Sequence, residues 1–93
     1  MRLRWTDDAV RDFTHICDYI EMHASPQVAR RLALSVHRQL DQLADFPESG
    51  RTGRRPDTRE LVFDGLPYLA IYRIHNELVE ILRILHGAQM WPK

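Results

Sequence analysis

The first half of the chain contains two stretches in which apolar residues recur every three or four positions. The apolar positions of the first stretch are Ala9, Phe13, Ile16, Cys17 and Ile20. This spacing places the apolar side chains along one side of a helix and predicts an amphipathic α-helix of about four turns. Thr6 precedes the stretch, and its hydroxyl can accept a hydrogen bond from a free backbone N–H at the helix start.

The second stretch follows Ser25-Pro26 directly. Serine is a favoured N-cap residue and proline is favoured at the first helical position, so this pair predicts a new helix. The apolar positions of the second stretch are Ala29, Leu32, Ala33, Val36, Leu40 and Leu43. We therefore predict a helix from Pro26 to about Asp45. Because only residues 23–25 separate the two helices, we expect them to form an antiparallel hairpin.

The second half of the chain, and the segment before the first helix, show the patterns of β-strands. The predicted strands cover residues 2–5, 58–63, 68–75 and 78–86. Alternating polar and apolar residues mark the first strand, and β-branched and aromatic residues mark the others. Residues 46–50 contain Pro and Gly and end the second helix. Residues 51–57 are rich in Arg, Gly and Pro, and we predict a loop there.

A two-residue turn at Asn76-Glu77 determines how the last two strands would pair. The expected pairs are His75 with Leu78, Ile74 with Val79, Arg73 with Glu80, Tyr72 with Ile81, and Ile71 with Leu82. Arg73 and Glu80 carry opposite charges, which favours this register. The order of elements predicts one α+β domain over residues 1–93, in which the N-terminal strand and the helical hairpin pack on a small antiparallel β-sheet.

Composition narrows the range of functions. The chain has 13 basic and 13 acidic residues and no net charge, which argues against general nucleic-acid binding. Residues 1–50 carry a net charge of −2, and residues 51–93 carry +2. Four arginines, Arg51, Arg54, Arg55 and Arg59, are close together in the sequence. This cluster suits an acidic partner or a phosphate backbone, although it is also compatible with a solvated loop.

Several other classes of protein are not expected. Cys17 is the only cysteine, so no intrachain disulfide can form, and we expect it to be a buried apolar residue. No apolar run approaches the roughly 18 residues of a membrane span, and the N-terminal residues do not resemble a signal peptide. The histidines show no close ligand pair, and we expect neither a metal nor a cofactor. We therefore expect a cytoplasmic protein.

Short motifs along nearly the whole chain resemble one family, the RelE/ParE superfamily of toxins. They are Trp5-Thr6-Asp7-Asp8-Ala9, Asp18-Tyr19-Ile20 before Ser25-Pro26, Phe46-Pro47 with Gly50-Arg51 and Gly53-Arg54, Thr58-Arg59-Glu60-Leu61-Val62, Pro67-Tyr68, Tyr72-Arg73-Ile74, and the run Ile81-Leu82-Arg83-Ile84-Leu85-His86-Gly87-Ala88-Gln89. The resemblance implies the toxin of a type II toxin–antitoxin pair, held inactive by a cognate antitoxin that folds on binding. ParE-like members inhibit DNA gyrase, whereas RelE-like members cleave messenger RNA on the ribosome.

The resemblance assigns candidate residues to each activity. A nuclease of the YoeB or YafQ type would use Arg59, Arg83 and His86, and Arg73 is a further candidate. The lysine pair of RelE is missing, because Lys93 is the only lysine, and Met90-Trp91-Pro92 stands where a C-terminal tyrosine is expected. The resemblance therefore favours a ParE-like gyrase inhibitor over a ribosome-dependent endonuclease.

These candidates also have purely structural interpretations. Arg73 could serve only as the partner of Glu80, Arg83 could pair with a carboxylate such as Glu60, and His86 could be a strand-edge residue. For the binding function, the candidate partner-binding residues are Arg51, Arg54, Arg55 and Trp91, together with the helical hairpin. An inactive relative that only binds its antitoxin is a third hypothesis.

Overall fold

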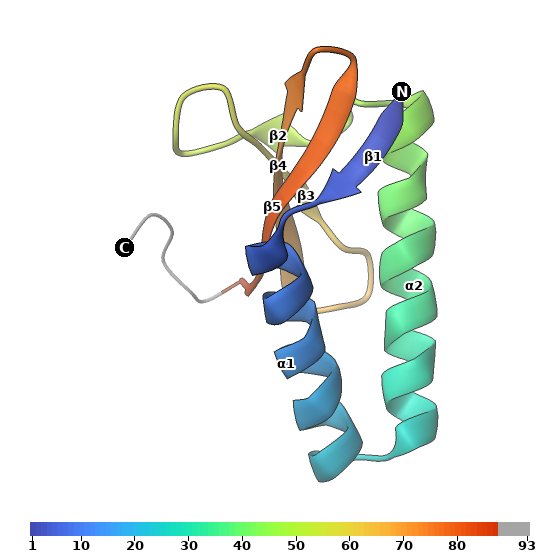
Figure 1. Cartoon of the computed structure of the whole chain (residues 1–93). Helices are drawn as coiled ribbons and strands as arrows, with labels where there is room; N and C mark the ends of the chain where they lie inside the picture. Colours follow the sequence, from blue (N-terminus) through green and yellow to red (C-terminus); the bar gives the residue numbers. More distant parts are fainter. Residues whose placement is uncertain (88–93) are drawn as a thin grey trace.

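The computed structural model describes residues 1–87, which form two helices and five strands (Figure 1). In chain order the elements are β1 (Arg2–Trp5), α1 (Asp7–His23), α2 (Pro26–Asp45), β2 (Arg51–Thr52), β3 (Arg59–Val62), β4 (Tyr68–His75) and β5 (Leu78–His86). The α+β class is confirmed, and so are the predicted helical hairpin and the four strands expected from the sequence.

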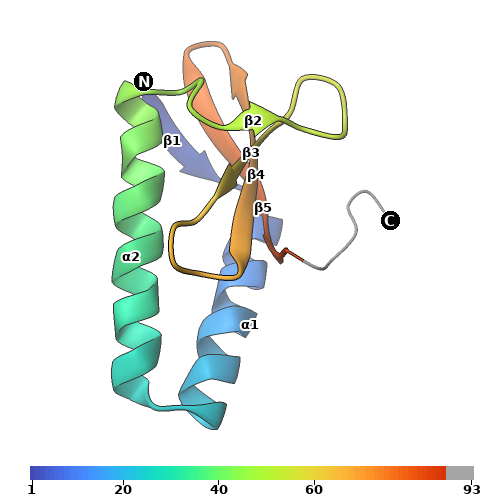
Figure 2. The same cartoon turned by 180° about the vertical axis from the view of Figure 1, so that it is seen from behind.

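Both helices begin as the sequence predicts. The hydroxyl of Thr6 accepts a hydrogen bond from the N–H of Ala9 at 3.1 Å, and the hydroxyl of Ser25 accepts one from Val28 at 3.1 Å. The two helices run side by side on one face of the sheet and extend beyond it (Figures 1 and 2). Their apolar stripes therefore supply one layer of the core.

The sheet differs from the expectation in two respects. Its strand order is β1-β5-β4-β3-β2, and β1 pairs with β5 in parallel, so the sheet is mixed rather than antiparallel. Alternation predicts which residues of a strand face the core, but it does not predict the direction of the neighbouring strand. The second difference is β2, which forms where we predicted a loop. Arg51 pairs there with Glu60 of β3, nine positions farther along the chain and beyond the Arg/Gly/Pro-rich turn.

The hairpin of β4 and β5 follows the predicted register for the first four pairs. The fifth prediction was wrong, because Ile71 lies opposite Arg83 instead of Leu82. A β-bulge between Tyr72 and Ile71 accommodates one additional residue of β5. A turn fixes the register only as far as the first bulge, and nothing in the turn sequence signals where a bulge occurs.

The sheet is apolar on both faces. The larger cluster faces the helices and includes Leu40, Leu43, Tyr72, Val79 and Ile81. A smaller cluster, with Leu69, Ile71, Leu82 and Leu85, lies on the other face. Because β4 contributes to both clusters, its sequence is a nearly continuous apolar run. Cys17 packs against the larger cluster but is only half-buried, so it is less enclosed than we expected.

Candidate functional site

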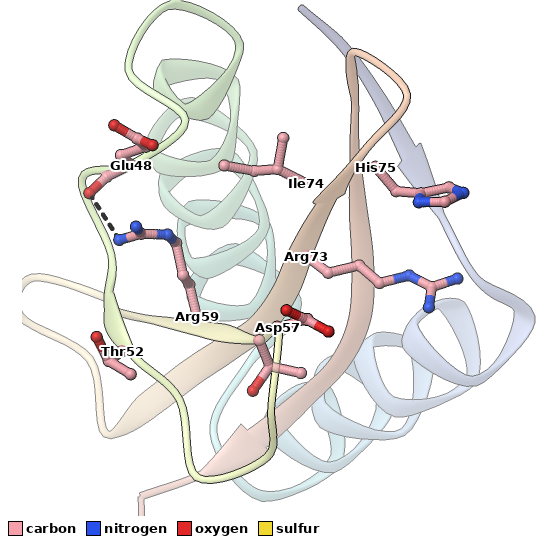
Figure 3. Close-up of a pocket in the computed structure, with 8 residues that line it drawn as sticks. Glu48, Thr52, Asp57, Arg59, Arg73, Ile74 and His75 are labelled. Atoms are coloured by element: carbon pink, nitrogen blue, oxygen red, sulfur yellow. Dashed lines mark hydrogen bonds between the residues drawn. The ribbon is translucent and has the colours of Figure 1, made fainter.

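Two hollows adjoin the loop that connects β2 to β3. The larger, which we call the Arg59 hollow, has a volume of about 760 Å³ (Figure 3). It is lined by Glu48, Thr52, Asp57, Thr58, Arg59, Arg73, Ile74 and His75. The smaller, the Arg83 hollow, has a volume of about 490 Å³ and is lined by Thr6, Asp8, Arg55, Pro56, Asp57, Thr58, Arg73, Leu82 and Arg83. Arg73 borders both hollows, so this strand residue links them.

Arg59 projects from β3 into the larger hollow but is held by the chain itself. Its Nη1 donates to the carbonyl of Gly50 at 2.9 Å and to that of Glu48 at 3.2 Å (Figure 3). Tyr72, opposite Arg59 in the sheet, is fully buried. Its hydroxyl donates to the carbonyl of Pro47 at 2.7 Å and accepts from the N–H of Gly50 at 2.9 Å. Arg59 and Tyr72 together fix the segment between α2 and β2.

Arg73 is the predicted partner of Glu80, and the structure confirms the pair. The Nε of Arg73 donates to Oε1 of Glu80 at 2.7 Å. Arg4 of β1 contacts the other oxygen of the same carboxylate at 2.8 Å. Glu80 is only 6% exposed, and two arginines from neighbouring strands supply its charge partners. This three-residue bridge joins β1, β5 and β4.

Arg83 does not pair with Glu60, contrary to one of our interpretations. It makes a two-pronged contact with Asp12 of α1, at 2.6 Å from Nε and 3.0 Å from Nη2. Glu60 pairs instead with Arg51, at 2.9 Å. Hydrogen bonding to Asp12 raises the pKa of Arg83 above its ordinary value. Asp12 also accepts a hydrogen bond from the backbone N–H of Ile84 at 3.0 Å, so it ties α1 to β5.

His86 lies at the end of β5, opposite Tyr68 in the sheet. The two rings meet edge to face, with 5.7 Å between their centroids. His86 lines neither of the two hollows. Burial, with smaller contributions from Tyr19 and Cys17, raises the pKa of Tyr68 above 10.0, so this phenol is protonated at neutral pH.

The three nuclease candidates therefore occupy separate places. Arg59 lines one hollow and Arg83 the other, and the two hollows share Asp57, Thr58 and Arg73 along their border. His86 lies farther along β5. Arg59, Arg83 and His86 are thus not gathered around one hollow.

The partner-binding candidates lie mainly on the loop between β2 and β3. Arg51, Arg54 and Arg55 are exposed. Arg51 is bound to Glu60, and Arg55 lines the Arg83 hollow. Trp91 lies outside the described residues. The residue that sequence reasoning missed is Asp12, since it occurs among the polar positions of α1 and nothing in its spacing distinguishes it.

Two negative findings apply to residues 1–87. No group of three or more His, Cys, Asp or Glu side chains is arranged to hold a metal ion there. Within the same residues, neither helix has the length and apolar character needed to cross a membrane.

Comparison with known proteins identifies the family. Residues 3–91 match the family model described as "ParE toxin of type II toxin-antitoxin system, parDE". The chain belongs to the ParE toxin family. Toxin RelE2 of Caulobacter vibrioides is 42% identical to this ParE-family chain over 86 residues, which cover 92% of this chain and 94% of the relative. Y4kP of Sinorhizobium fredii, named as a candidate toxin, is 44% identical over 92 residues, covering 99% and 94%.

Solved structures agree with the fold of this ParE-family protein. A chain of the chromosomal ParDE toxin–antitoxin system of P. aeruginosa superposes with a TM-score of 0.85 at 27% identity, covering 92% of this chain and 95% of that chain. A chain of the intact RelBE toxin–antitoxin complex of E. coli superposes with a TM-score of 0.62 at 13% identity, covering 95% and 98%. At that identity the second likeness concerns the fold alone.

Proposed function

We propose that this ParE-family protein arrests growth by inhibiting DNA gyrase and that a cognate antitoxin neutralises it. The observation that carries the choice of target is the separation of Arg59, Arg83 and His86. Cleavage of a messenger requires a base, an acid and cations around one phosphate. Here Arg59 is bound to loop carbonyls and Arg83 to Asp12, while His86 lies against Tyr68.

Sequence features support the same choice. The chain contains a single lysine, Lys93, so it has no lysine pair of the RelE type. No tyrosine occurs after Tyr72. The ribosome-dependent endonuclease is the alternative function, and the similarity to the protein named toxin RelE2 favours it.

The basic loop is a candidate contact surface for an acidic partner. Arg54 is exposed, and within residues 1–87 it makes no ion pair or hydrogen bond. Reversing its charge should therefore weaken a partner contact without unfolding the protein. Arg2 on β1 is also exposed, lies outside the basic loop and the helical hairpin, and provides a matched control for the change in net charge.

A supercoiling assay with purified gyrase tests the proposal. We expect the toxin to inhibit supercoiling, its antitoxin to restore it, and R54E to inhibit less than R2E. Absence of inhibition at micromolar excess would exclude gyrase as the target. Toeprinting on translating ribosomes tests the alternative, because a nuclease would leave a cleaved message that H86A should no longer produce.

A further inference from the structure

On the side of β4 that faces β3, the backbone of Ile74 has no partner within residues 1–87. The N–H of Phe63 donates to the carbonyl of Tyr68 at 3.1 Å, which makes these residues a hydrogen-bonded pair. In an antiparallel ladder such pairs recur at every second residue. Along the register of β3 and β4 the next ones are Leu61 with Ala70 and Arg59 with Tyr72. The following position on β4 is Ile74.

The pairing of β4 with β5 also indicates the direction in which the backbone groups of Ile74 point. His75 and Leu78 flank the two-residue turn, so they form a hydrogen-bonded pair, as do Arg73 and Glu80. The N–H and C=O groups of Arg73 and His75 thus point toward β5. Those of Ile74 point the opposite way, toward the line of β3.

No strand continues β3 to meet Ile74. The chain turns away at Asp57, which has a φ of 62°, and Thr58 is tied to Gly53 of the preceding segment. The paired register of β3 and β4 ends at Arg59 and Tyr72. Within residues 1–87 no hydrogen bond to the N–H or C=O of Ile74 is present on this side. Ile74 is one of the residues that line the Arg59 hollow (Figure 3), so a partner that enters the hollow would lie close to this strand position.

The chemistry of the hollow points to a peptide. A donor and an acceptor on one strand residue are both satisfied by the C=O and N–H of an extended segment added to the sheet edge. The carboxylates of Glu48 and Asp57 offset the charges of Arg59 and Arg73, so the hollow does not select an anion by charge. Backbone hydrogen bonds would therefore provide most of the recognition.

We propose that an extended segment of the antitoxin enters the Arg59 hollow and pairs with the backbone of Ile74, in the position that a longer β3 would occupy. The identity of the occupant rests on the proposed function, since a ParE-family toxin is expected to have an antitoxin. The segment is short, because β3 limits it on one side and the turn at residues 76–77 ends β4 on the other. Because backbone hydrogen bonds rather than charges hold the segment, we expect its affinity to depend only weakly on salt, whereas binding to the basic loop should weaken as salt rises.

Val62 provides a matched control on another edge of the sheet. Its N–H points toward the side of β2, but β2 pairs only with Arg59 and Glu60. Beyond Val62, the amide of Gln39 accepts from the N–H of Asp64 at 2.8 Å and donates to its C=O at 3.2 Å. A partner strand at Val62 would thus be blocked by side chains on one side and by β2 on the other.

Amide hydrogen exchange tests the proposal without altering the protein. The probe is a candidate antitoxin, defined as the protein encoded by the reading frame next to the toxin gene, used whole and as overlapping peptides. In the free toxin we expect the amide of Ile74 to exchange at least about tenfold faster than those of Arg73 and His75. In the complex we expect the exchange of the Ile74 amide to slow by at least about tenfold.

Proline substitution provides the second measurement. I74P removes an N–H that faces the open edge and keeps the ladder to β5. It also removes a half-buried side chain that packs against the larger core cluster, so I74A, which keeps the N–H, controls for that loss. We expect I74P to raise the dissociation constant of the complex about tenfold and V62P to leave it unchanged.

The other outcomes overturn the proposal in distinguishable ways. A complex in which the Ile74 amide still exchanges rapidly, or in which V62P is the damaging change, would refute the site but not the proposed function. Protection of Ile74 in the free toxin that grows with concentration would show pairing between copies of this chain. Failure of the neighbouring protein to bind would refute both the site and the antitoxin partnership.

Discussion

Among the charged residues that are not fully buried, Asp12 is the one whose removal should lower the stability of this fold most. Its carboxylate makes three hydrogen bonds, two with Arg83 at 2.6 and 3.0 Å and one with the N–H of Ile84 at 3.0 Å. D12A would leave a guanidinium and a backbone N–H without their partner, and the Asp12 side chain is only 15% exposed.

The magnitude follows from burial. Removing one member of a fully buried ion pair costs about 3–5 kcal/mol. The side chain of Arg83 is 30% exposed, so water can partly replace Asp12. We expect D12A to lower the free energy of unfolding by about 2–3 kcal/mol. For a domain of this size that corresponds to a fall of about 10–20 °C in Tm.

Urea and thermal unfolding of D12A, R83M and the double variant measure the coupling between the two residues. D8N is the matched control, because Asp8 makes an exposed contact with Arg11 in which both side chains are 64% exposed. It should change stability by less than about 0.5 kcal/mol. If D12A is as mild as D8N, or if the double-variant cycle shows no coupling, the role assigned to Asp12 is refuted.

Three further predictions concern the turn, the buried tyrosine and pH. E77G should raise stability by about 1 kcal/mol in urea unfolding, because Glu77 has a φ of 61° that glycine adopts freely. Y72F should lower it by about 1–3 kcal/mol, since the N–H of Gly50 and the carbonyl of Pro47 lose their partner. Burial raises the pKa of the Cys17 thiol above 9.0 and that of Tyr72 above 10.0. The folded state holds these protons more tightly, so stability is retained below about pH 9 and falls as the pH rises to about 10.5, which urea titrations at both values would detect.

The sequence predicted the elements because each has a local cause. Thr6 and Ser25 cap the helices, and the bounds of α2, β4 and β5 agree with the prediction. The turn at Asn76-Glu77 fixed four strand pairs, including Arg73 with Glu80, because the turn and the pairs are adjacent in the chain. Local sequence therefore determined most of the fold.

Features that depend on distant residues were not predictable in this way. The parallel pairing of β1 with β5, the short strand β2 and the bulge after Tyr72 each require knowledge of what lies opposite in space. The same limit applies to the site. Sequence identified Arg83 as a candidate but could not indicate Asp12 as its partner, since 71 positions separate them in the chain.

The way the sheet edges are closed bears on where a partner can bind. β1 ends opposite Ile81 of β5. Beyond that point Thr6 bonds to the edge of β5: its N–H donates to the carbonyl of Ile81 at 3.0 Å, and its hydroxyl donates to the carbonyl of Leu82 at 2.9 Å. Farther along β5, the carboxylate of Asp12 accepts a hydrogen bond from the N–H of Ile84. Side chains of the helical layer thus satisfy a strand edge that would otherwise attract another strand. Ile74 has no such cover among the described residues, and it borders a hollow. Within residues 1–87 the outer edges of β1 and β2, the two outermost strands, are the other places where a strand could add. The proposal therefore requires that the antitoxin slow amide exchange at Ile74 and not only along β1 or β2.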